Sequence, residues 1–419
     1  MNAPLSQGAA VRVFLCFAAG YFMSYALRSV NAVIAPELVR EFALSNAQLG
    51  ALSSAYFLAF AALQLPLGVA LDRFGSRRTD AGLLVFAALG CALFATAQGV
   101  TALWLARALI GVGVAGALMA PLRAFRFWYA PARQQQLVAW MLVAGTLGAL
   151  STTVPVRLAI PLLGWRGVFW VACGLLLASS IAIWTLLPRG ERAGQADPGG
   201  GALWRGYREV FASRYLWRFA IVGIVIHASF ISLQSLWAGP WFVTVLEMSP
   251  VQAAETLFAF NLVLMFAFLA LGWVVPRIER RGWSVLRVVS IGTGLVLLVQ
   301  VGIGVSGGAI AVALWLALAV LATHFTMIQT HVSLSFPEHL TGRAFTAYNL
   351  LTFIGIFSSQ SLFGWIVDTV RQFVTSDPDA FRAAWLIWVG IELAAFAVLI
   401  FWRVAPPGQT TGQDAQPGH

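Results

Sequence analysis

Residues 68–78, GVALDRFGSRR, place one acid and three arginines between two apolar segments. Gly68 allows two helices to approach closely, and Asp72 can pair with an arginine or face a helix end across an interface between two halves of the chain. Such contacts can hold one conformation and release in another, whereas the alternative is a solvated charge run that only orients the protein. We treat the stretch as a candidate conformational gate, made of Gly68, Asp72, Arg73, Gly75, Arg77 and Arg78.

The composition around this stretch is that of a membrane protein. Of 419 residues, 60% are hydrophobic and only 10% are charged, whereas a soluble chain carries about 25% charged residues. A membrane-spanning helix needs about 20 apolar residues, and twelve such segments fit this length. The sequence therefore predicts an all-α membrane protein with twelve transmembrane helices in a lipid bilayer.

The apolar segments fall into two sets of six, separated by a polar, glycine-rich stretch that is typical of a linker. The first set is 12–35, 48–71, 80–98, 101–125, 135–160 and 166–187, and the second is 217–244, 252–276, 286–306, 308–334, 344–369 and 382–402. The predicted regions are an N-terminal six-helix bundle (1–187), a cytoplasmic linker (188–214), a C-terminal six-helix bundle (215–403) and a disordered cytoplasmic tail (404–419).

The net charge of +10 is concentrated in alternate loops. Arginine-rich loops are cytoplasmic by the positive-inside rule. This placement predicts both termini on the cytoplasmic side of a bacterial inner membrane, and it argues against nucleic acid as a partner. The clustered arginines are Arg73, Arg77 and Arg78, then Arg189, Arg192, Arg205, Arg208, Arg214 and Arg218, then Arg277, Arg280, Arg281 and Arg287.

The two halves of the chain repeat one another at an offset of 204 positions (68 to 272). Duplicated six-helix halves place a substrate site near the bilayer midplane, between the halves. The matched positions are Pro36 with Pro240, Ser45 with Ser249, Gln48 with Gln252, Gly68 with Gly272 and Arg73 with Arg277.

The stretch at 68–78 resembles the signature loop of the major facilitator superfamily, G-x-x-x-D-R-x-G-R-R, with Ser76 as an extra residue. A degenerate copy, GWVVPRIERRG, has Pro276 in place of the acid. The stretches RALIGVGVAG, which contains Arg107, and LLGWRGVFW resemble further elements of the same family. The resemblance covers essentially the whole chain, and it implies a secondary transporter whose bundles rock around a central cavity. Arg107 is expected to have a conformational or structural role.

An arginine within the first apolar segment raises a question of its own. Arg28 lies in YALRSVNAVIAP, and an arginine at the centre of a membrane helix costs about 2.5–3.5 kcal/mol on insertion scales. The stretch resembles the first helix of the organophosphate and anion–cation symporter branches of the family, which implies that Arg28 meets the anionic group of a substrate. The phosphate-ester branch pairs this arginine with a basic residue in the seventh helix. The repeat places Ser232 there, beside His227 and Gln234, so a carboxylate is favoured.

Other polar residues within apolar segments could line the same cavity. Arg123 could supply a second positive charge, or it could be a snorkelling anchor. His324 could be a hydrogen-bonded core residue or, like His227, could carry a coupling proton, since histidine titrates near neutrality. The candidate substrate-binding residues are Tyr25, Arg28, Asn31, Arg123, His227, Gln234, Asn261, His324 and Asn349.

Neither an enzyme nor a cofactor-dependent protein is expected. The chain contains no nucleotide-binding loop, and its three cysteines lie in apolar segments where packing is the simpler role. The leading hypothesis is uptake of a small organic anion by a monomeric transporter, coupled to a proton or another ion, without a metal. The alternative is export of an amphiphilic drug-like compound or siderophore, given aromatic residues such as Trp237 and Trp241.

Overall fold

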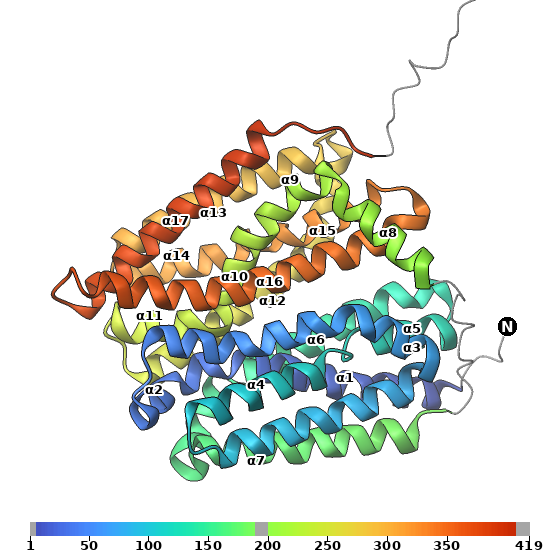
Figure 1. The fold of residues 1–419 in the computed structure, drawn as a ribbon, viewed down its shortest axis with the longest axis horizontal. Helices are drawn as coiled ribbons and strands as arrows, with labels where there is room; N and C mark the ends of the chain where they lie inside the picture. The colour runs from blue at the N-terminus through green and yellow to red at the C-terminus, as the bar shows by residue number, and fades with distance from the viewer. Residues whose placement is uncertain (1–5, 189–199, 408–419) are drawn as a thin grey trace, which may run out of the picture.

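The structure is a computed structural model that describes residues 6–188 and 200–407. Most of the predicted tail and the first part of the predicted linker, with Arg189 and Arg192, lie outside the described residues. Figure 1 shows the helices arranged as two bundles, one above the other, with the first half of the chain below. Ten described helices are long and apolar enough to cross a membrane, and Gln136–Ser151 is a shorter apolar helix. The protein is therefore a multi-pass membrane protein.

The N-terminal bundle contains six rods, although some helices are broken and others are joined. α3 turns at Gly75 (φ 77°) and α7 at Gly164 (φ 66°), a conformation that glycine adopts readily because it has no Cβ. The turn at Gly75 is sharp, since the Thr79 hydroxyl donates to the Ala70 carbonyl oxygen at 3.2 Å. The helices are α1 (Gln7–Ser29), α2 (Asn31–Phe42), α3 (Asn46–Thr96), α4 (Val100–Val114), α5 (Met119–Trp128), α6 (Pro131–Ser151) and α7 (Val154–Leu186).

The C-terminal bundle repeats this plan after the linker helix α8 (Gly200–Ala212). Its first rod contains two π-helical turns and its fourth a 3₁₀ turn. That first rod is α9 (Arg214–Val222), η1 (Gly223–His227), α10 (Ala228–Ser232), η2 (Leu233–Trp237) and α11 (Ala238–Thr244). The others are α12 (Pro250–Arg280), α13 (Val285–Val305), α14 (Gly308–Leu321) with η3 (Ala322–His324) and α15 (Phe325–Leu334), α16 (Glu338–Val370) and α17 (Asp377–Phe401). The twelve predicted segments are thus recovered as twelve rods.

The internal repeat predicted from sequence is visible in local structure. Ser45 and Gln48 form a capping box at the start of α3, with hydrogen bonds of 3.2 and 3.0 Å between each side chain and the other residue's N–H. Ser249 and Gln252 form the same box before α12, at 3.2 and 2.9 Å. A capping box satisfies two N–H groups that a helix start leaves free. The second helix of each bundle therefore begins in the same way.

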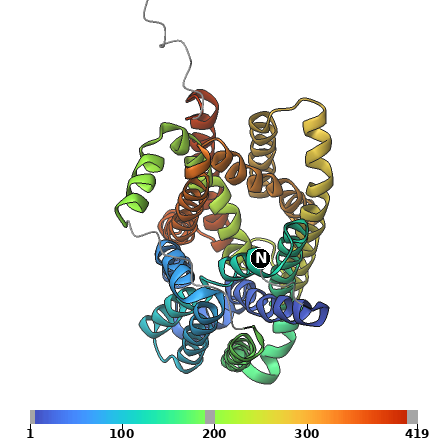
Figure 2. The same ribbon diagram turned by 90° about the vertical axis from the view of Figure 1, so that its right-hand side faces the viewer.

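The two ends of the molecule differ. We call the end that carries α8 and the turn at Gly75 the arginine-rich end; it lies on the right in Figure 1, and Figure 2 looks along the bundles from it. The other end, which carries the turns before α3 and after α16, we call the opposite end. The bundles are joined at the opposite end, where α3 and α16 run side by side.

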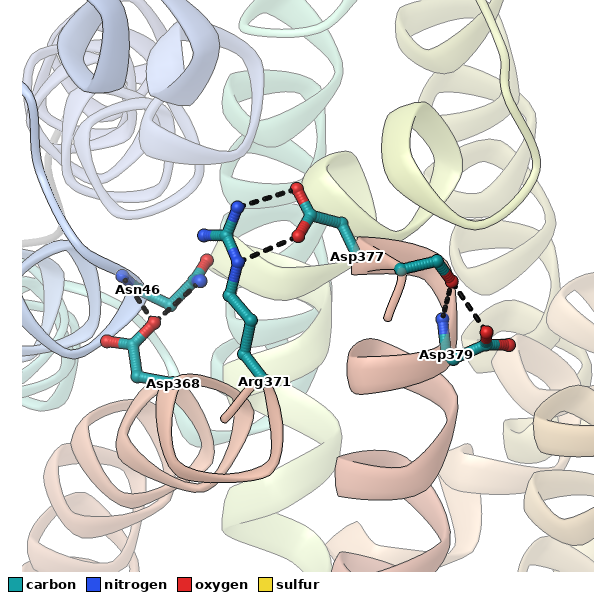
Figure 3. A network of polar contacts seen from close by, with 6 residues as sticks. Asn46, Asp368, Arg371, Asp377 and Asp379 are labelled. Carbon is teal, nitrogen blue, oxygen red and sulfur yellow. Dashed lines mark hydrogen bonds and ion pairs between the residues drawn. The ribbon is translucent and has the colours of Figure 1, made fainter. Parts of the chain in front are cut away.

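A carboxylate ties the bundles together at the opposite end. Asp368, near the end of α16, accepts hydrogen bonds from the Asn46 and Ala47 backbone N–H groups at 3.2 and 2.7 Å, and from Asn46 Nδ2 at 2.8 Å. Figure 3 shows this contact, with Arg371 beside it paired to Asp377 at 2.8 Å. The first N–H groups of a helix lack internal partners and carry partial positive charge. The acid of one bundle therefore caps a helix of the other.

Glycines bring the backbones of the two bundles into direct contact below this cap. A Cβ at Gly50 would lie 2.3 Å from the Gln360 carbonyl oxygen, and one at Gly239 would lie 1.9 Å from that of Ala32. A Cβ at Gly364 would lie 2.3 Å from the Asn46 carbonyl oxygen. No side chain fits at these three places, so the opposite end is closed by backbone packing.

Replacing Gly50 by alanine is expected to open the opposite end, because the added Cβ collides with the Gln360 carbonyl oxygen across the interface. A cysteine introduced at the buried Ser54, whose hydroxyl lies 2.9 Å from that of Ser361, should then react several-fold faster with a water-soluble thiol reagent. Gly174→Ala is the matched control, since no atom lies within 4 Å of its added Cβ. Equal reaction rates in the two backgrounds would contradict this account of closure.

Candidate functional site

A cavity of about 430 Å³ lies between the bundles. Its wall comes from both halves of the chain, chiefly from α1, α3, α6, η1, η2, α12 and α16. A volume of this size suits a small organic molecule. Its hydrogen-bonding wall residues include Tyr25, Arg28, Gln64, His227, Gln234, Gln329 and Asn349. We call this space the inner cavity.

Arg28 supplies the one formal charge on the described wall of the inner cavity. Its guanidinium carbon lies 4.5 Å from the ring centroid of Tyr25 and 5.7–5.9 Å from those of Phe57, Phe60 and Phe353. Aromatic faces attract a cation at such distances but cannot neutralise it. Among the described residues, Arg28 makes no ion pair and its buried Nε has no hydrogen-bond partner.

The acids nearest to Arg28 along the chain are engaged elsewhere. Glu37 pairs with Arg157 at 2.5 Å, and Glu41 pairs with Arg166 at 2.6 Å while accepting a 2.7 Å hydrogen bond from Trp165 Nε1. Desolvation opposes ionisation of Glu41, but the hydrogen bonds from Trp165 and Arg166 outweigh it and lower its pKa. These pairs lie toward the opposite end, so they leave Arg28 without a counter-ion.

Arg28 lies next to the junction of α1 and α2 in the first rod. α1 ends at Ser29 and α2 begins at Asn31. Arg107 of α4, which is fully buried, donates from its guanidinium to the Leu27 carbonyl oxygen at 2.7 Å, directly beside Arg28 in the chain. The Arg107 guanidinium carbon also lies 5.0 Å from the Tyr56 ring centroid. Arg107 thus contacts the backbone that carries Arg28, and a conformational or structural role for Arg107 stays a prediction.

The C-terminal bundle contributes uncharged polar groups to the cavity wall, set among apolar side chains. Gln234 Nε2 donates to Asn261 Oδ1 at 2.8 Å, and Gln329 Nε2 donates to Asn349 Oδ1 at 3.4 Å. His227 stacks on Phe325, with ring centroids 5.2 Å apart, and its Nδ1 has no partner among the described residues. The amide and imidazole groups can hydrogen-bond hydroxyl or carbonyl groups of a ligand.

The structure brings together five of the nine candidate residues and leaves four off the inner wall. Tyr25, Arg28, His227, Gln234 and Asn349 line the inner cavity. Asn31 and Asn261 are buried, and Asn261 reaches the cavity only through Gln234. His324 is buried too: its Nε2 lies 3.1 Å from the Thr293 hydroxyl and its Nδ1 2.6 Å from the Leu321 carbonyl oxygen. Substrate contact stays a prediction for all nine, and Arg123, the ninth, lies further out.

A second cavity of about 470 Å³ adjoins the first at Gln64 and Met119 and leads toward the arginine-rich end. Asp72 of α3 and Arg123 of α5 form an ion pair on its wall. Tyr207 of α8 also lines it, and burial raises the pKa of this phenol against the opposing effects of Thr346 and Arg343. We call this space the outer cavity. The ion pair spans two helices of one bundle and not the bundle interface.

The remaining gate residues lie around the turn of α3. The Arg77 guanidinium donates to the Trp184 carbonyl oxygen of α7, and that of Arg73 lies 5.4 Å from the Phe74 ring centroid. Arg78 is exposed. Gly68 lines the outer cavity, and no described atom lies within 4 Å of where its Cβ would be. The close helix approach expected at Gly68 is therefore absent in this conformation, and a gating role for these residues stays a prediction.

Neutralising Asp72 or Arg123 should slow transport more than it weakens binding. The pair is partly exposed, with 52% and 26% of the two side chains accessible, and such pairs contribute only about 0–1 kcal/mol to stability. We expect Asp72→Asn and Arg123→Gln each to reduce turnover in proteoliposomes while anion affinity stays within a few-fold. A large loss of affinity in Arg123→Gln alone would instead make Arg123 a ligand-binding residue.

Two features of the site were not predicted from sequence. The rings of Phe57, Phe60 and Phe353 lie near the Arg28 guanidinium, and Phe60 and Phe353, which line the inner cavity, have ring centroids 4.4 Å apart across the bundle interface. Asp80 is fully buried in α3, at the first residue of a predicted apolar segment, and it was not among the predicted site residues. The helical spacing of Phe57 and Phe60 could have indicated a shared face, but their partner on α16 could not be read from sequence.

Comparisons with known proteins agree with this architecture. The family model described as Major Facilitator Superfamily matches residues 17–360. A structure of a bacterial homologue of the human lysosomal transporter Spinster, inward-facing and occupied, superposes with a TM-score of 0.77 at 16% identity, covering 94% of this chain and 97% of that one. A D-xylose–proton symporter structure gives a TM-score of 0.76 at 16% identity, covering 96% and 100% of the two chains. At such identities these likenesses concern the fold alone.

Sequence relatives match over shorter stretches. A probable sulfoacetate transporter of Cupriavidus necator is 30% identical over 167 residues, which is 40% of this chain and 38% of the relative. A probable L-galactonate transporter of Escherichia coli is 28% identical over 225 residues, covering 49% and 48% of the two chains. A galacturonate transporter of Dickeya chrysanthemi is 26% identical over 167 residues, covering 40% and 47%. Each match spans less than half the length of the relative.

Proposed function

The chain belongs to the Major Facilitator Superfamily, and on that premise we propose that it moves a small organic anion, with a carboxylate favoured, across a bacterial inner membrane. As a secondary transporter it has no enzymatic reaction to perform. It works by alternating access, in which the inner cavity opens to one side of the membrane at a time. Proton coupling and uptake are part of the proposal.

The observation that carries this proposal is that the Arg28 guanidinium forms no ion pair with any described residue. A permanent charge with no acid beside it is costly in a membrane, and an anionic ligand relieves that cost whenever it binds. Guanidinium donors match the two oxygens of a carboxylate. The names of the relatives, which include sulfoacetate, L-galactonate and galacturonate transporters, support the same class of substrate.

The rest of the wall favours a ligand with one anionic group. Ser232, the repeat equivalent of Arg28, is buried and lies off the described wall of the inner cavity, so no second arginine faces the first. The uncharged donors and acceptors of Gln234, Gln329 and Asn349 suit hydroxyl groups at the other end of the ligand. A hydroxylated carboxylate fits this distribution better than a phosphate ester.

Orientation follows from the arginine distribution. If arginine-rich loops face the cytoplasm, both cavities lead to the cytoplasm in this conformation, and the closed opposite end faces outward. A substrate taken up from outside would then leave along the outer cavity, past Asp72 and Arg123. Both termini would be cytoplasmic.

The alternative of exporting an amphiphilic compound loses its main argument. Trp237 and Trp241 are buried inside the C-terminal bundle, where Trp237 packs on Phe363 at 5.0 Å and Trp241 on Trp385 at 4.6 Å between ring centroids. Neither lines the described part of the inner cavity. Of the aromatic side chains that do line it, Tyr25, Phe60 and Phe353 lie around the charged Arg28.

Substituting Arg28 tests the proposal. Arg28→Gln should weaken binding of galacturonate or sulfoacetate, whichever the wild-type protein binds, by about 1.5–3 kcal/mol, the scale of a charged hydrogen bond. Arg28→Lys should recover part of the affinity, because it keeps the charge but loses the planar donors. Binding is measured by calorimetry, and melting temperature is measured on the same samples.

The matched control is Arg126→Gln, which removes an equal charge from the outer cavity and should leave affinity unchanged. If Arg28 were only a structural hydrogen-bonding group, Arg28→Gln would lower the melting temperature and leave affinity in the folded fraction intact. That result, or binding of neutral galactose as tightly as galacturonate, would remove the anion hypothesis.

A further inference from the structure

We propose that Asp80 is a proton-binding site, and that its protonation favours the conformation in which the opposite end is closed. The proposal deepens the coupling part of the proposed function by naming the group that holds the ion. It concerns a residue outside the inner cavity and needs no particular substrate.

Asp80 is a buried acid without a partner. None of its surface is accessible, and both carboxylate oxygens lack a hydrogen-bond partner among the described residues. An ionised carboxylate in such surroundings is very unfavourable, and a group placed there takes up a proton instead. The carboxyl group therefore belongs in this conformation in its neutral form.

The surroundings of Asp80 connect it to the moving parts of the transporter. A Cβ at Gly20 of α1 would lie 4.0 Å from Oδ2, and one at Gly116 would lie 3.1 Å from Oδ1. Gly116 falls in the irregular turn between α4 and α5. The chain neighbours of these glycines, Tyr21 and Ala115, both line the inner cavity. The acid thus lies one residue behind the cavity wall, against a break in a helix.

Helix irregularities hold coupling ions in some membrane transporters; in this turn the Ala115, Ala117 and Ala120 N–H groups stay hydrogen-bonded to nearby carbonyl oxygens, which leaves the carboxyl group of Asp80 as the group that can bind an ion. A single carboxyl group with no nearby acid, histidine or cysteine cluster among the described residues suits a proton better than a metal ion. Proton binding here converts the carboxylate and one H⁺ into a carboxylic acid, and release reverses it.

No ion pair among the described residues includes Asp80. The elements packed around Asp80 carry other titratable groups. They are Arg12, Cys16, Tyr21, Tyr25 and Arg28 on α1, Tyr56, Asp72, Arg73, Arg77, Arg78 and Cys91 on α3, Arg107 on α4, Arg123 and Arg126 on α5, and Arg157, Arg166 and Cys173 on α7.

Linkage gives the direction of the pH response. A conformation that accepts Asp80 only in its neutral form is stabilised at low pH and loses that stabilisation as pH rises and the proton leaves. If another conformation accepts the charged form, raising the pH must shift the population toward it. The bundles should therefore separate at the opposite end as pH increases.

The test measures the distance between spin labels on Arg40→Cys and Gln372→Cys, two exposed positions of different bundles at the opposite end, in purified protein without substrate. The three native cysteines are buried. In the otherwise wild-type protein the distance between the two labels should increase as pH rises, and Asp80→Asn should abolish this shift. Glu392→Gln, at another fully buried acid, and His227→Gln, on the cavity wall, should retain it.

A pH-independent distance in wild type, or an unchanged shift in Asp80→Asn, overturns the proposal, as does loss of the shift in Glu392→Gln or His227→Gln alone. Asp80→Ser serves if the asparagine variant does not fold. Failure to bind any organic anion would count against the proposed substrate and leave this result as it stands.

A second measurement needs no substitution. With isotope-labelled aspartate, infrared spectra at about pH 6, well above the ~3.9 of an exposed aspartate, should show the carbonyl stretch of one protonated aspartic acid. The other described aspartates are exposed or hydrogen-bonded: Asp72, Asp368, Asp377 and Asp379. Absence of this band overturns the proposal.

Discussion

An arginine that lies among aromatic rings, with no counter-ion among the described residues, sets the requirements for the structure around it. Arg28 cannot lose its charge, so the protein must supply either water or an anion at that depth. The inner cavity supplies the space, and the paired acids Glu37 and Glu41 are kept away by Arg157 and Arg166. Arg107 fixes the backbone beside Arg28 through the Leu27 carbonyl oxygen, which keeps the guanidinium at the cavity wall.

Sequence reasoning recovered the architecture because the signals for it are local. Hydropathy marked the twelve rods, and the repeated Ser-x-x-Gln pairs at Ser45 and Ser249 mark true helix starts in both bundles. The motif glycine Gly75 lies at a turn that needs a positive φ. The family resemblance added the two-bundle arrangement and the expectation that Arg28 faces a central cavity.

The site was recovered only in part, because the face of a helix depends on its irregularities. Val30 separates α1 from α2 directly before Asn31, and the π-helical turn η2 ends at Trp237, directly before α11. Each shifts the angular position of the residues beyond it relative to a regular helix. Hydropathy does not detect such irregularities, and Asn31, directly after the junction of α1 and α2, does not line the described cavity wall. Asn261 lies in the continuous helix α12, where Gln234 stands between it and the cavity.

The cap at Asp368 has no counterpart in the repeat. At an offset of 204 positions (164 to 368), Asp368 corresponds to Gly164, and Asn46 corresponds to Pro250. A glycine and a proline cannot reproduce a carboxylate that accepts three N–H groups. At the opposite end, no described hydrogen bond or ion pair joins α12 to α6 or α7, although these helices touch. The duplicated fold is thus symmetric in shape but not in the bonds between its halves. Hydrogen bonds join α16 to the start of α3, whereas α12 meets α6 and α7 by packing alone among the described contacts. Separation meets less resistance along α6, α7 and α12.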